Sequence, residues 1–152
     1  MEKWKTIFFV IKLLGKILID FEKNLKNKKI FVTGNTGFTG SWVCFWLKSI
    51  GAETIGFSLP PNTSPALFSS LNLDKEMKTI FGNICDYEFL KKSILNFQPD
   101  LILHLAAQSL VYKGYNQPLQ TFNTNVIGTA NILEVSRSFE NLQGILCITN
   151  GT

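Results

Sequence analysis

Short apolar runs alternate with segments of helical periodicity along most of this chain. Near-continuous apolar runs are typical of strands that are buried on both faces of a parallel sheet. They predict strands at residues 29–33, 54–58, 78–81, 101–105 and 144–148. Apolar positions at helical spacing predict helices at residues 37–50, 67–71, 86–97 and 118–139. The alternation predicts an α/β fold, a doubly wound parallel sheet with helices on both faces.

Residues at the expected helix ends support these boundaries. Asp86 is placed to cap the helix that follows it. Gly51 stands directly after the helix 37–50, and Pro118 suits a first helical turn. Within helix 37–50, four large side chains recur at helical spacing and are expected in the core rather than at a ligand: Trp42, Phe45, Trp46 and Ile50.

Residues 1–27 differ from the rest of the chain and predict a basic amphipathic leader helix. Apolar residues recur on one side of its helical wheel, namely Ile7, Ile11, Leu14, Leu18 and Phe21, with lysines opposite. The segment 1–29 holds eight lysines against three acidic residues, whereas the remaining residues are nearly neutral. The helix could lie on an anionic membrane surface, but packing on its own domain or a partner is favoured. Its apolar stretch is too short to span a bilayer.

Composition excludes several classes of function. The chain is 45% hydrophobic and 17% charged over 152 residues, which predicts a globular protein of about one domain, residues 28–152. The near-neutral body lacks the clustered basic residues that nucleic-acid binding needs. Cys44, Cys85 and Cys147 are far apart and odd in number, which argues against a disulfide framework and a zinc site. We interpret them as buried, inert thiols of a cytoplasmic protein.

The glycine motif 34–40 carries the strongest chemical signal. Gly34, Gly37 and Gly40 directly follow a predicted strand and open a predicted helix. In that context the first glycine allows a sharp turn, the second lets the backbone approach a pyrophosphate, and the third brings helix and strand together. The phosphates would rest on free amide groups at the positive end of the helix. The motif therefore predicts dinucleotide binding.

The other strand ends are expected to converge on the same site, because ligands of open parallel sheets lie beyond the carboxyl ends of the strands. Dinucleotide sites commonly place an acidic residue at the end of the second strand for the ribose hydroxyls, or an arginine for a 2′-phosphate. Ser58 stands at that position here, followed by Leu59 and Pro60. The residues alone therefore leave the choice between NAD and NADP open.

Further motifs carry a family resemblance. They are residues 32–40, 56–59 (Gly-Phe-Ser-Leu), 82–84 (Gly-Asn-Ile), 104–111 (His-Leu-Ala-Ala-Gln-Ser-Leu-Val) and 123–129 (Asn-Thr-Asn-Val-Ile-Gly-Thr). Together they resemble the amino-terminal part of the extended short-chain dehydrogenase/reductase family, and within it most closely the CDP-glucose 4,6-dehydratases. The resemblance implies a Rossmann-type sheet that is incomplete at its carboxyl end. It also implies an NAD-dependent lyase, in which hydride leaves C4 of the sugar, water is eliminated across C5 and C6, and hydride returns to C6.

The resemblance also assigns cofactor contacts. Asn83 and Ile84 would flank the adenine, although the family usually has aspartate at the first of these positions. Asn125 matches an asparagine that supports the active site from a long helix. The complete set of implied NAD-binding residues is Gly34, Thr36, Gly37, Phe38, Thr39, Gly40, Asn83, Ile84, Leu105, Ala106, Ala107, Asn125 and Thr149.

No catalytic or metal-binding residue is assigned. The family's Ser/Thr-Asp-Lys motif is replaced by residues 150–152, and its Tyr-x-x-x-Lys pair is absent. Tyr87 and Lys91 have that spacing, but they lie at the start of the helix after the third strand. His104, the only histidine, falls inside a predicted buried strand, which favours a structural role over acid–base chemistry.

Alternative functions remain open at this point. The chain is the cofactor-binding part of a truncated nucleotide-sugar dehydratase, a non-catalytic NAD-binding module, or a fragment of a related nucleotide-sugar epimerase. A nucleotide-sugar substrate would require a carboxyl-terminal lobe, and homo-oligomer formation is left open. The last predicted strand is expected to expose an unpaired apolar edge, which predicts self-association of the isolated chain.

Overall fold

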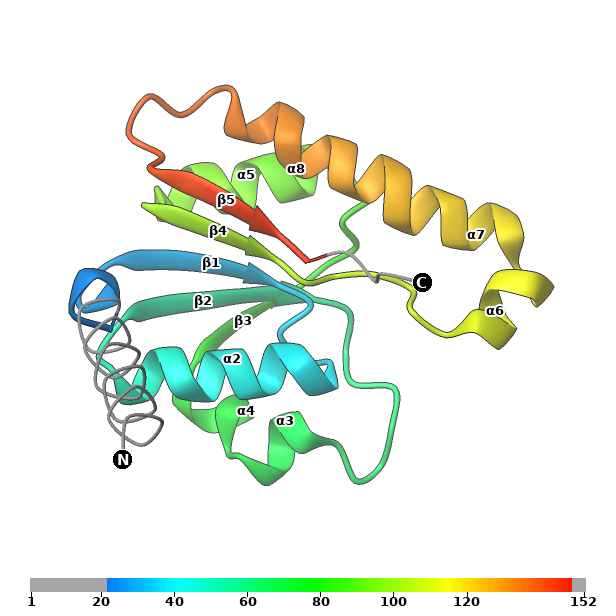
Figure 1. The fold of residues 1–152 in the computed structure, drawn as a ribbon, viewed down its shortest axis with the longest axis horizontal. Coiled ribbons are helices and arrows are strands. Elements are labelled where there is room, and N and C mark those ends of the chain that lie inside the picture. Colours follow the sequence, from blue (N-terminus) through cyan, green and yellow to red (C-terminus); the bar gives the residue numbers. More distant parts are fainter. Residues whose placement is uncertain (1–21, 149–152) are drawn as a thin grey trace, which may run out of the picture.

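A five-stranded parallel sheet forms the centre of the protein, with helices on both faces (Figure 1). The computed structural model describes residues 22–148. The strands are β1 (Lys29–Thr33), β2 (Glu53–Ser58), β3 (Lys78–Phe81), β4 (Leu101–His104) and β5 (Gly144–Cys147). They pair in the order β3-β2-β1-β4-β5, and every pair is parallel. The predicted strands and the doubly wound Rossmann architecture are thereby confirmed.

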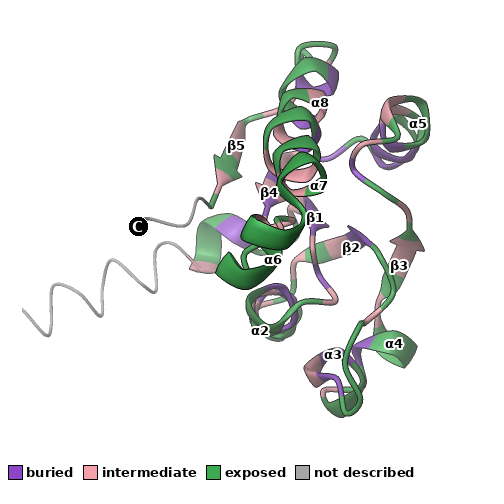
Figure 2. Ribbon diagram, turned by 90° about the vertical axis from the view of Figure 1, so that its right-hand side faces the viewer, coloured by how far each residue is buried: buried purple, intermediate pink, exposed green. Residues whose placement is uncertain are grey.

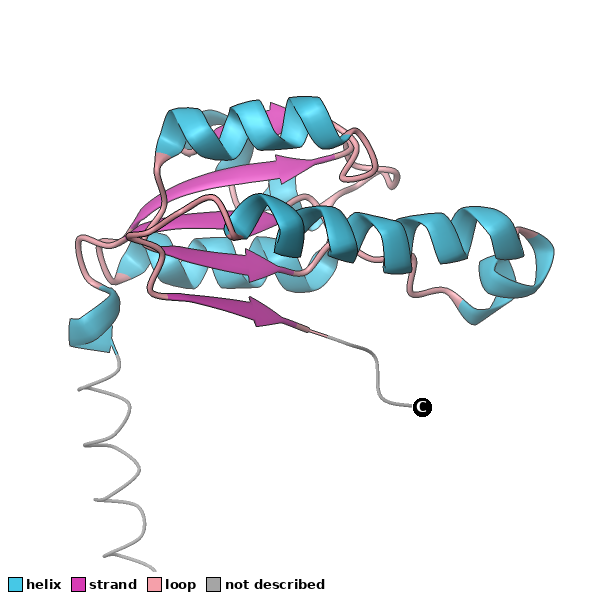
Figure 3. Cartoon of the chain, turned by 90° about the horizontal axis from the view of Figure 1, so that it is seen from above, coloured by secondary structure: helices cyan, strands magenta, loops and turns pink. Residues whose placement is uncertain are grey.

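The helices divide between the two faces of the sheet. They are α2 (Phe38–Ser49), α3 (Leu67–Ser70), α4 (Leu73–Glu76), α5 (Tyr87–Phe97), α6 (Val111–Asn116), α7 (Pro118–Phe122) and α8 (Gly128–Ser136), with a π-helical segment η1 (Asn123–Ile127) between the last two. Helices α2, α3 and α4 cover one face, and α5 and α8 cover the other (Figure 1). The predicted helix 118–139 forms as α7, η1 and α8 in continuous succession, and it extends past the ends of the strands (Figure 3). The patterns did not predict α4 and α6.

Alternation along β1 supplies both halves of the core, because successive strand residues point to opposite faces. Phe31 belongs to the cluster between the sheet and α5 and α8, whereas Ile30 and Val32 belong to the cluster under α2, α3 and α4. All three side chains are completely buried. At about 25 cal/mol per Å² of apolar surface removed from water, such side chains dominate the stability of the fold.

The aromatic residues of α2 correct one sequence prediction. Trp42 and Phe45 are 46% and 44% exposed, so they are not core residues, whereas Trp46 and Ile50 are partly buried and do pack against the core cluster under α2. The helix instead faces the sheet with a second stripe: Gly40, Ser41, Cys44 and Leu47. Small residues at the start of this stripe let the helix approach the strand closely, which the spacing of the large residues did not reveal.

The sheet is less completely covered around β4 and β5. The expectation that β4 is buried on both faces holds for Ile102 and His104, whereas Leu101 and Leu103 are only partly buried. β5 pairs on one side only among the described residues, and Leu146 is 54% exposed. Helices α6 and α7 are also mostly exposed, as the green ribbon in Figure 2 shows.

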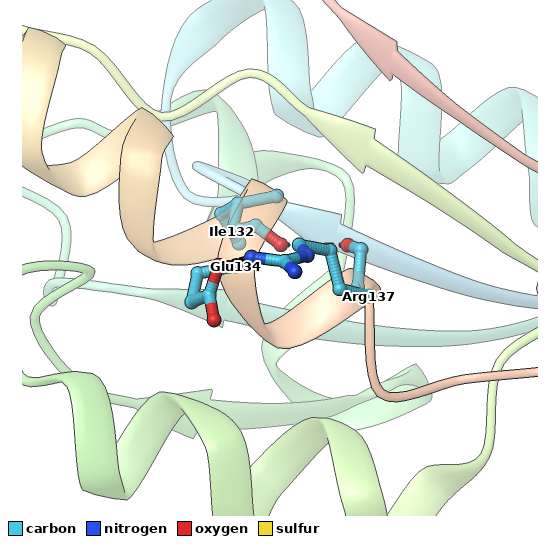
Figure 4. A network of polar contacts seen from close by, with 4 residues as sticks. Ile132, Glu134 and Arg137 are labelled. Atoms are coloured by element: carbon cyan, nitrogen blue, oxygen red, sulfur yellow. Dashed lines mark hydrogen bonds and ion pairs between the residues drawn. The ribbon is translucent and has the colours of Figure 1, made fainter.

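Capping and surface contacts define the ends of two helices. The Asp86 carboxylate accepts a hydrogen bond from the Phe89 amide at 3.1 Å, which confirms the predicted cap of α5. At the end of α8, Glu134 and Arg137 form an ion pair of 2.9 Å (Figure 4). Both side chains are exposed, so this pair is worth at most about 1 kcal/mol.

The predicted leader helix lies largely outside the described residues. Residues 22–25 are helical, and Leu25 is buried against the α2 side of the core. Within residues 22–148, no helix combines the length and apolar character needed to cross a bilayer.

Candidate functional site

A pocket of about 390 Å³ lies at the carboxyl ends of the strands. It opens where the strand order reverses, because the chain runs outward from β1 to β3 and then returns to the other side of β1 with β4. Such switch points are where open parallel sheets bind ligands. The lining residues are Gly34, Thr36, Gly37, Phe38, Thr39, Gly40, Ser58, Leu59, Pro60, Asn62, Gly82, Asn83, Ile84, Leu105, Ala106, Ala107, Ser109, Gln120 and Thr124.

The pocket contains every predicted site residue except Asn125 and Thr149. Asn125 lies in η1, outside the lining, and Thr149 lies outside the described residues. Leu59, Pro60 and Asn62 were missed, although they follow β2 closely and the rule of strand ends could have found them. Gln120 and Thr124 were also missed, and no local pattern marks them, because α7 and η1 reach the pocket through the tertiary fold.

The glycine loop is shaped by close backbone approach. Gly34 has a φ of +74°, and a Cβ there would meet the Ala106 nitrogen at 2.7 Å. A Cβ on Gly40 would overlap the carbonyl oxygen of Gly34. Both positions therefore require glycine, and together they hold the end of β1, the start of α2 and the segment after β4 against one another.

The start of α2 is suited to an anion. Its N-cap is Gly37, which has no side chain to cap the free amides, and its first turn contains no acidic residue. The first amides of a helix have no carbonyl partner within it, and the helix end carries partial positive charge. The Ser41 hydroxyl donates to the Gly37 carbonyl at 2.7 Å and so braces the loop from behind. This cradle fits a pyrophosphate.

Two hydroxyl groups meet at the end of β2. The Thr36 hydroxyl donates to the Leu59 carbonyl at 2.8 Å, and its oxygen lies 2.7 Å from the Ser58 hydroxyl oxygen. Neither an acidic side chain nor an arginine is present among the lining residues. The polar character of this end of the pocket therefore comes from neutral groups.

The segment after β3 also lines the pocket, with Gly82, Asn83 and Ile84. The Asn83 side-chain oxygen accepts a hydrogen bond from the Cys85 amide at 3.0 Å, which fixes the turn. Ile84 is 4% exposed, and its carbonyl accepts from the Asn131 side chain at 2.9 Å. Since Asn83 retains a free lone pair on that oxygen, it can still accept one further hydrogen bond.

His104 connects the end of β4 to its neighbours. The Thr129 hydroxyl donates to the Asn125 carbonyl at 2.7 Å, so it accepts from His104 Nε2 at 3.0 Å. His104 Nδ1 is then unprotonated and accepts from the Thr33 hydroxyl at 2.7 Å. This network assigns the neutral Nε2–H tautomer. Burial lowers the pKa of His104, in agreement with its predicted structural role.

Asn125 acts on the backbone beyond β4. Its side-chain oxygen accepts a hydrogen bond from the backbone amide of Gln108 at 2.8 Å, and its side-chain nitrogen donates to the backbone carbonyl of Gln108 at 3.0 Å. This reciprocal pair joins η1 to the segment that follows Ala107. Single π-helical turns inside α-helices often occur at functional sites, which agrees with the supporting role expected of Asn125.

Other candidate groups lie outside the pocket or are inert. Burial raises the pKa of the Cys44 thiol to about 12 and also raises that of Cys85 and Cys147. The thiols are therefore protonated at neutral pH, but only Cys44 is fully buried. The Lys91 ammonium lies 5.6 Å from the centre of the Tyr87 ring, and neither residue lines the pocket. No cluster of potential metal ligands occurs within residues 22–148.

Comparison with known proteins identifies similar sequences. The family described as GDP-mannose 4,6 dehydratase matches residues 31–152. The CDP-glucose 4,6-dehydratase of Salmonella typhimurium is 42% identical over 130 residues, which cover 85% of this chain and 36% of that protein. The chain thus spans about a third of the length of the curated relatives it matches.

Solved structures show the same architecture. The UDP-glucose 4-epimerase of Thermotoga maritima, solved with UDP-glucose, matches 81% of this chain and 38% of its own, with a TM-score of 0.70 and 28% identity. The UDP-glucose 4-epimerase of Thermus thermophilus, solved with NAD, matches 72% of this chain and 34% of its own, with a TM-score of 0.63 and 27% identity.

Proposed function

Because the chain belongs to the GDP-mannose 4,6 dehydratase family, we propose that it forms the NAD-binding part of a nucleotide-sugar 4,6-dehydratase. CDP-glucose is the proposed substrate of the whole protein, since the CDP-glucose enzyme of Salmonella typhimurium is 42% identical. The observation that carries the proposal is the pocket itself. Its glycine loop, open helix start and strand ends converge at the switch point of the sheet.

The residues present fit NAD in four places. The amides at the start of α2 would hold the pyrophosphate, and Ser58 would contact a ribose at the end of β2. The segment 83–84 would flank the adenine, and the segment 105–107 would line the other ribose. When bound, NAD supplies the capacity to take up a hydride from the sugar and to return it.

The acid–base groups of such a reaction are missing from the pocket walls. None of the described lining residues carries an ionisable side chain. Proton transfer to or from a sugar hydroxyl needs such a group within hydrogen-bond reach. We therefore propose that the 152-residue chain binds cofactor without turnover, and that the remaining length found in the relatives supplies the catalytic groups.

Titration calorimetry of the chain with NAD tests the proposal. We expect saturable binding, and we expect Gly37→Asp to weaken it by about 10-fold or more, because a carboxylate would repel the phosphates at the helix start. Gly114→Asp, in a glycine position with no neighbour within 4 Å, introduces the same charge as a control and leaves binding unchanged. A folded chain that fails to bind NAD contradicts the proposal.

A nucleotide-sugar 4-epimerase is the second candidate, favoured by the likeness to the epimerase structures of Thermotoga maritima and Thermus thermophilus. A version of the protein extended to the length of its relatives separates the two, with mass spectrometry to detect loss of water and nuclear magnetic resonance to detect the configuration at C4 of the product. Loss of one water from CDP-glucose supports the dehydratase. A product of unchanged mass with inverted C4 supports the epimerase.

A further inference from the structure

We propose that the hydroxyl pair Thr36–Ser58 makes the site selective for a ribose with a free 2′-hydroxyl, and that it disfavours a ribose with a 2′-phosphate. The inference rests on the proposed function, because it assumes a dinucleotide in this pocket. It deepens that function by assigning the choice between NAD and NADP to two neutral side chains. Neither an acidic clamp nor an arginine is needed for this choice.

Hydrogen-bond bookkeeping fixes the direction of each bond in the pair. A hydroxyl group has one hydrogen to donate and two lone pairs with which to accept. The hydrogen of Thr36 points to the Leu59 carbonyl, 2.8 Å from its oxygen. The 2.7 Å contact between the two hydroxyls therefore uses the hydrogen of Ser58. Ser58 is left with lone pairs alone, and it can only accept from a ligand.

The position of Ser58 brings this acceptor to the ribose. Ser58 is the last residue of β2, it lines the pocket, and it is 7% exposed. In dinucleotide sites of this architecture, the residue at this strand end reads the 2′ position of the adenosine ribose. A ribose hydroxyl has a hydrogen to donate to Ser58. A phosphate oxygen would instead place one acceptor against another in a nearly buried site, which is unfavourable.

Charge acts in the same direction. A 2′-phosphate adds a charge of about −2 at neutral pH, which other sites balance with a basic side chain. The lining residues near Ser58 are Leu59, Pro60 and Asn62, none of which is charged. No lysine or arginine occurs among the described residues that line the pocket. The added charge would therefore lose water without gaining a counterion.

The test compares the dissociation constants of NAD and NADP for the 152-residue chain by titration calorimetry at one ionic strength. We expect NAD to bind at least about 10-fold more tightly than NADP, because the 2′-phosphate of NADP would lose hydrogen bonds to water without gaining one from the protein. Ser58→Ala removes the acceptor, so NAD should bind about 3- to 10-fold more weakly while NADP changes little. Thr36→Val frees the hydrogen of Ser58, which can then donate to a phosphate, so the preference for NAD should fall.

Two further variants control the design. Thr39→Val removes a hydroxyl from the same loop that has no bond to Ser58, so both affinities should change together and their ratio should stay constant. Leu59→Arg supplies a counterion at a side chain that is 58% exposed, so NADP binding should improve. Together these variants distinguish a change in the ratio of NAD to NADP affinity, which reports recognition of the ribose 2′ position, from a loss of affinity for both cofactors.

The outcomes distinguish this inference from the proposed function. Equal affinity for NAD and NADP, or an unchanged ratio in Ser58→Ala, overturns the role of the hydroxyl pair while leaving dinucleotide binding in place. Binding of neither cofactor to the folded chain, verified by circular dichroism, overturns both.

Discussion

Large apolar side chains are buried in the centre of the sheet but exposed in the helical arm. We define the helical arm as residues 111–122, which form α6 and α7. In the sheet, Phe31 and Phe57 are completely buried, whereas in the arm Tyr115 and Leu119 are 84% and 86% exposed. Both regions are rich in large apolar side chains. Burial therefore depends on what packs against a residue and not on its apolar character alone.

The difference has a structural origin. Each central strand lies between two layers of helices, so its side chains are covered on both faces (Figure 1). The arm extends past the carboxyl ends of the strands, where no described residue covers its outer surface (Figures 2 and 3). Exposed apolar patches of this kind mark interaction surfaces or aggregation sites. The arm is thus the part of the molecule where additional packing would contribute most.

Truncating one phenylalanine in each region gives the largest expected contrast. Phe57→Ala should lower the free energy of unfolding by about 3–5 kcal/mol, because it opens a cavity in the core. Phe122→Ala, at a side chain that is 62% exposed, should change it by about 0.5 kcal/mol or less. Urea denaturation followed by circular dichroism measures both. Equal losses would show that the arm is packed in solution.

Adding one methyl group tests the close approach at the glycine loop. Gly40→Ala should destabilise the protein by about 1–3 kcal/mol, because the new Cβ would overlap the Gly34 carbonyl. Gly114→Ala in α6 is the matched control, since no atom lies within 4 Å of its Cβ position. That change should stabilise by up to about 1 kcal/mol through helix propensity. A neutral Gly40→Ala in urea denaturation would contradict the described packing of α2.

Polar substitution in the arm tests its tendency to associate. The chain is expected to self-associate at tens of micromolar through the unpaired edge of β5 and the exposed arm, and Leu119→Lys with Tyr115→Lys should reduce this by removing the apolar surface of the arm. Static light scattering across a dilution series measures the mass. As a control, Glu53→Lys changes charge on the exposed first residue of β2 and should leave association unchanged. A monodisperse monomer of the unmodified chain would contradict this prediction.

The smallest expected effect concerns pH. Burial holds the pKa of His104 below its ordinary value of 6.5, so the unfolded chain binds this proton more readily than the folded one. The resulting stability is fully present above about pH 6.5 and decreases as the pH falls through that value toward the lower folded pKa. Urea denaturation at a series of pH values from about 8 to about 5, which bracket the ordinary pKa of histidine, measures this change in stability. His104→Gln should flatten the dependence, and an equally steep curve would exclude His104 as its source.

Much of the fold could be predicted because the relevant forces are local in sequence. The strands appear as apolar runs, and Asp86 marks the start of α5 by its capping geometry. The glycine motif predicted the central part of the pocket, because the positive φ of Gly34 and the close approach of Gly40 to the Gly34 carbonyl both belong to the strand-to-helix turn itself. These features depend on neighbours a few residues away, which the sequence displays directly.

Contacts between distant segments could not be predicted in this way. Trp42 and Phe45 had the spacing of a core stripe, but the face of α2 that meets the sheet was decided by the close fit of Gly40 and Ser41. The tautomer of His104 depends on hydroxyl groups far away in the chain.

The sequence by itself determined the five strands and the longer helices between them, the glycine cradle and the family to which the chain belongs. Only the tertiary structure decided which hydroxyl of the Thr36–Ser58 pair donates, how Gln120 and Thr124 reach the pocket, and which apolar residues remain uncovered. The physical reason is that backbone preferences and apolar periodicity act over a few residues. Side-chain partners and burial are set by the packing of segments that are remote in the chain.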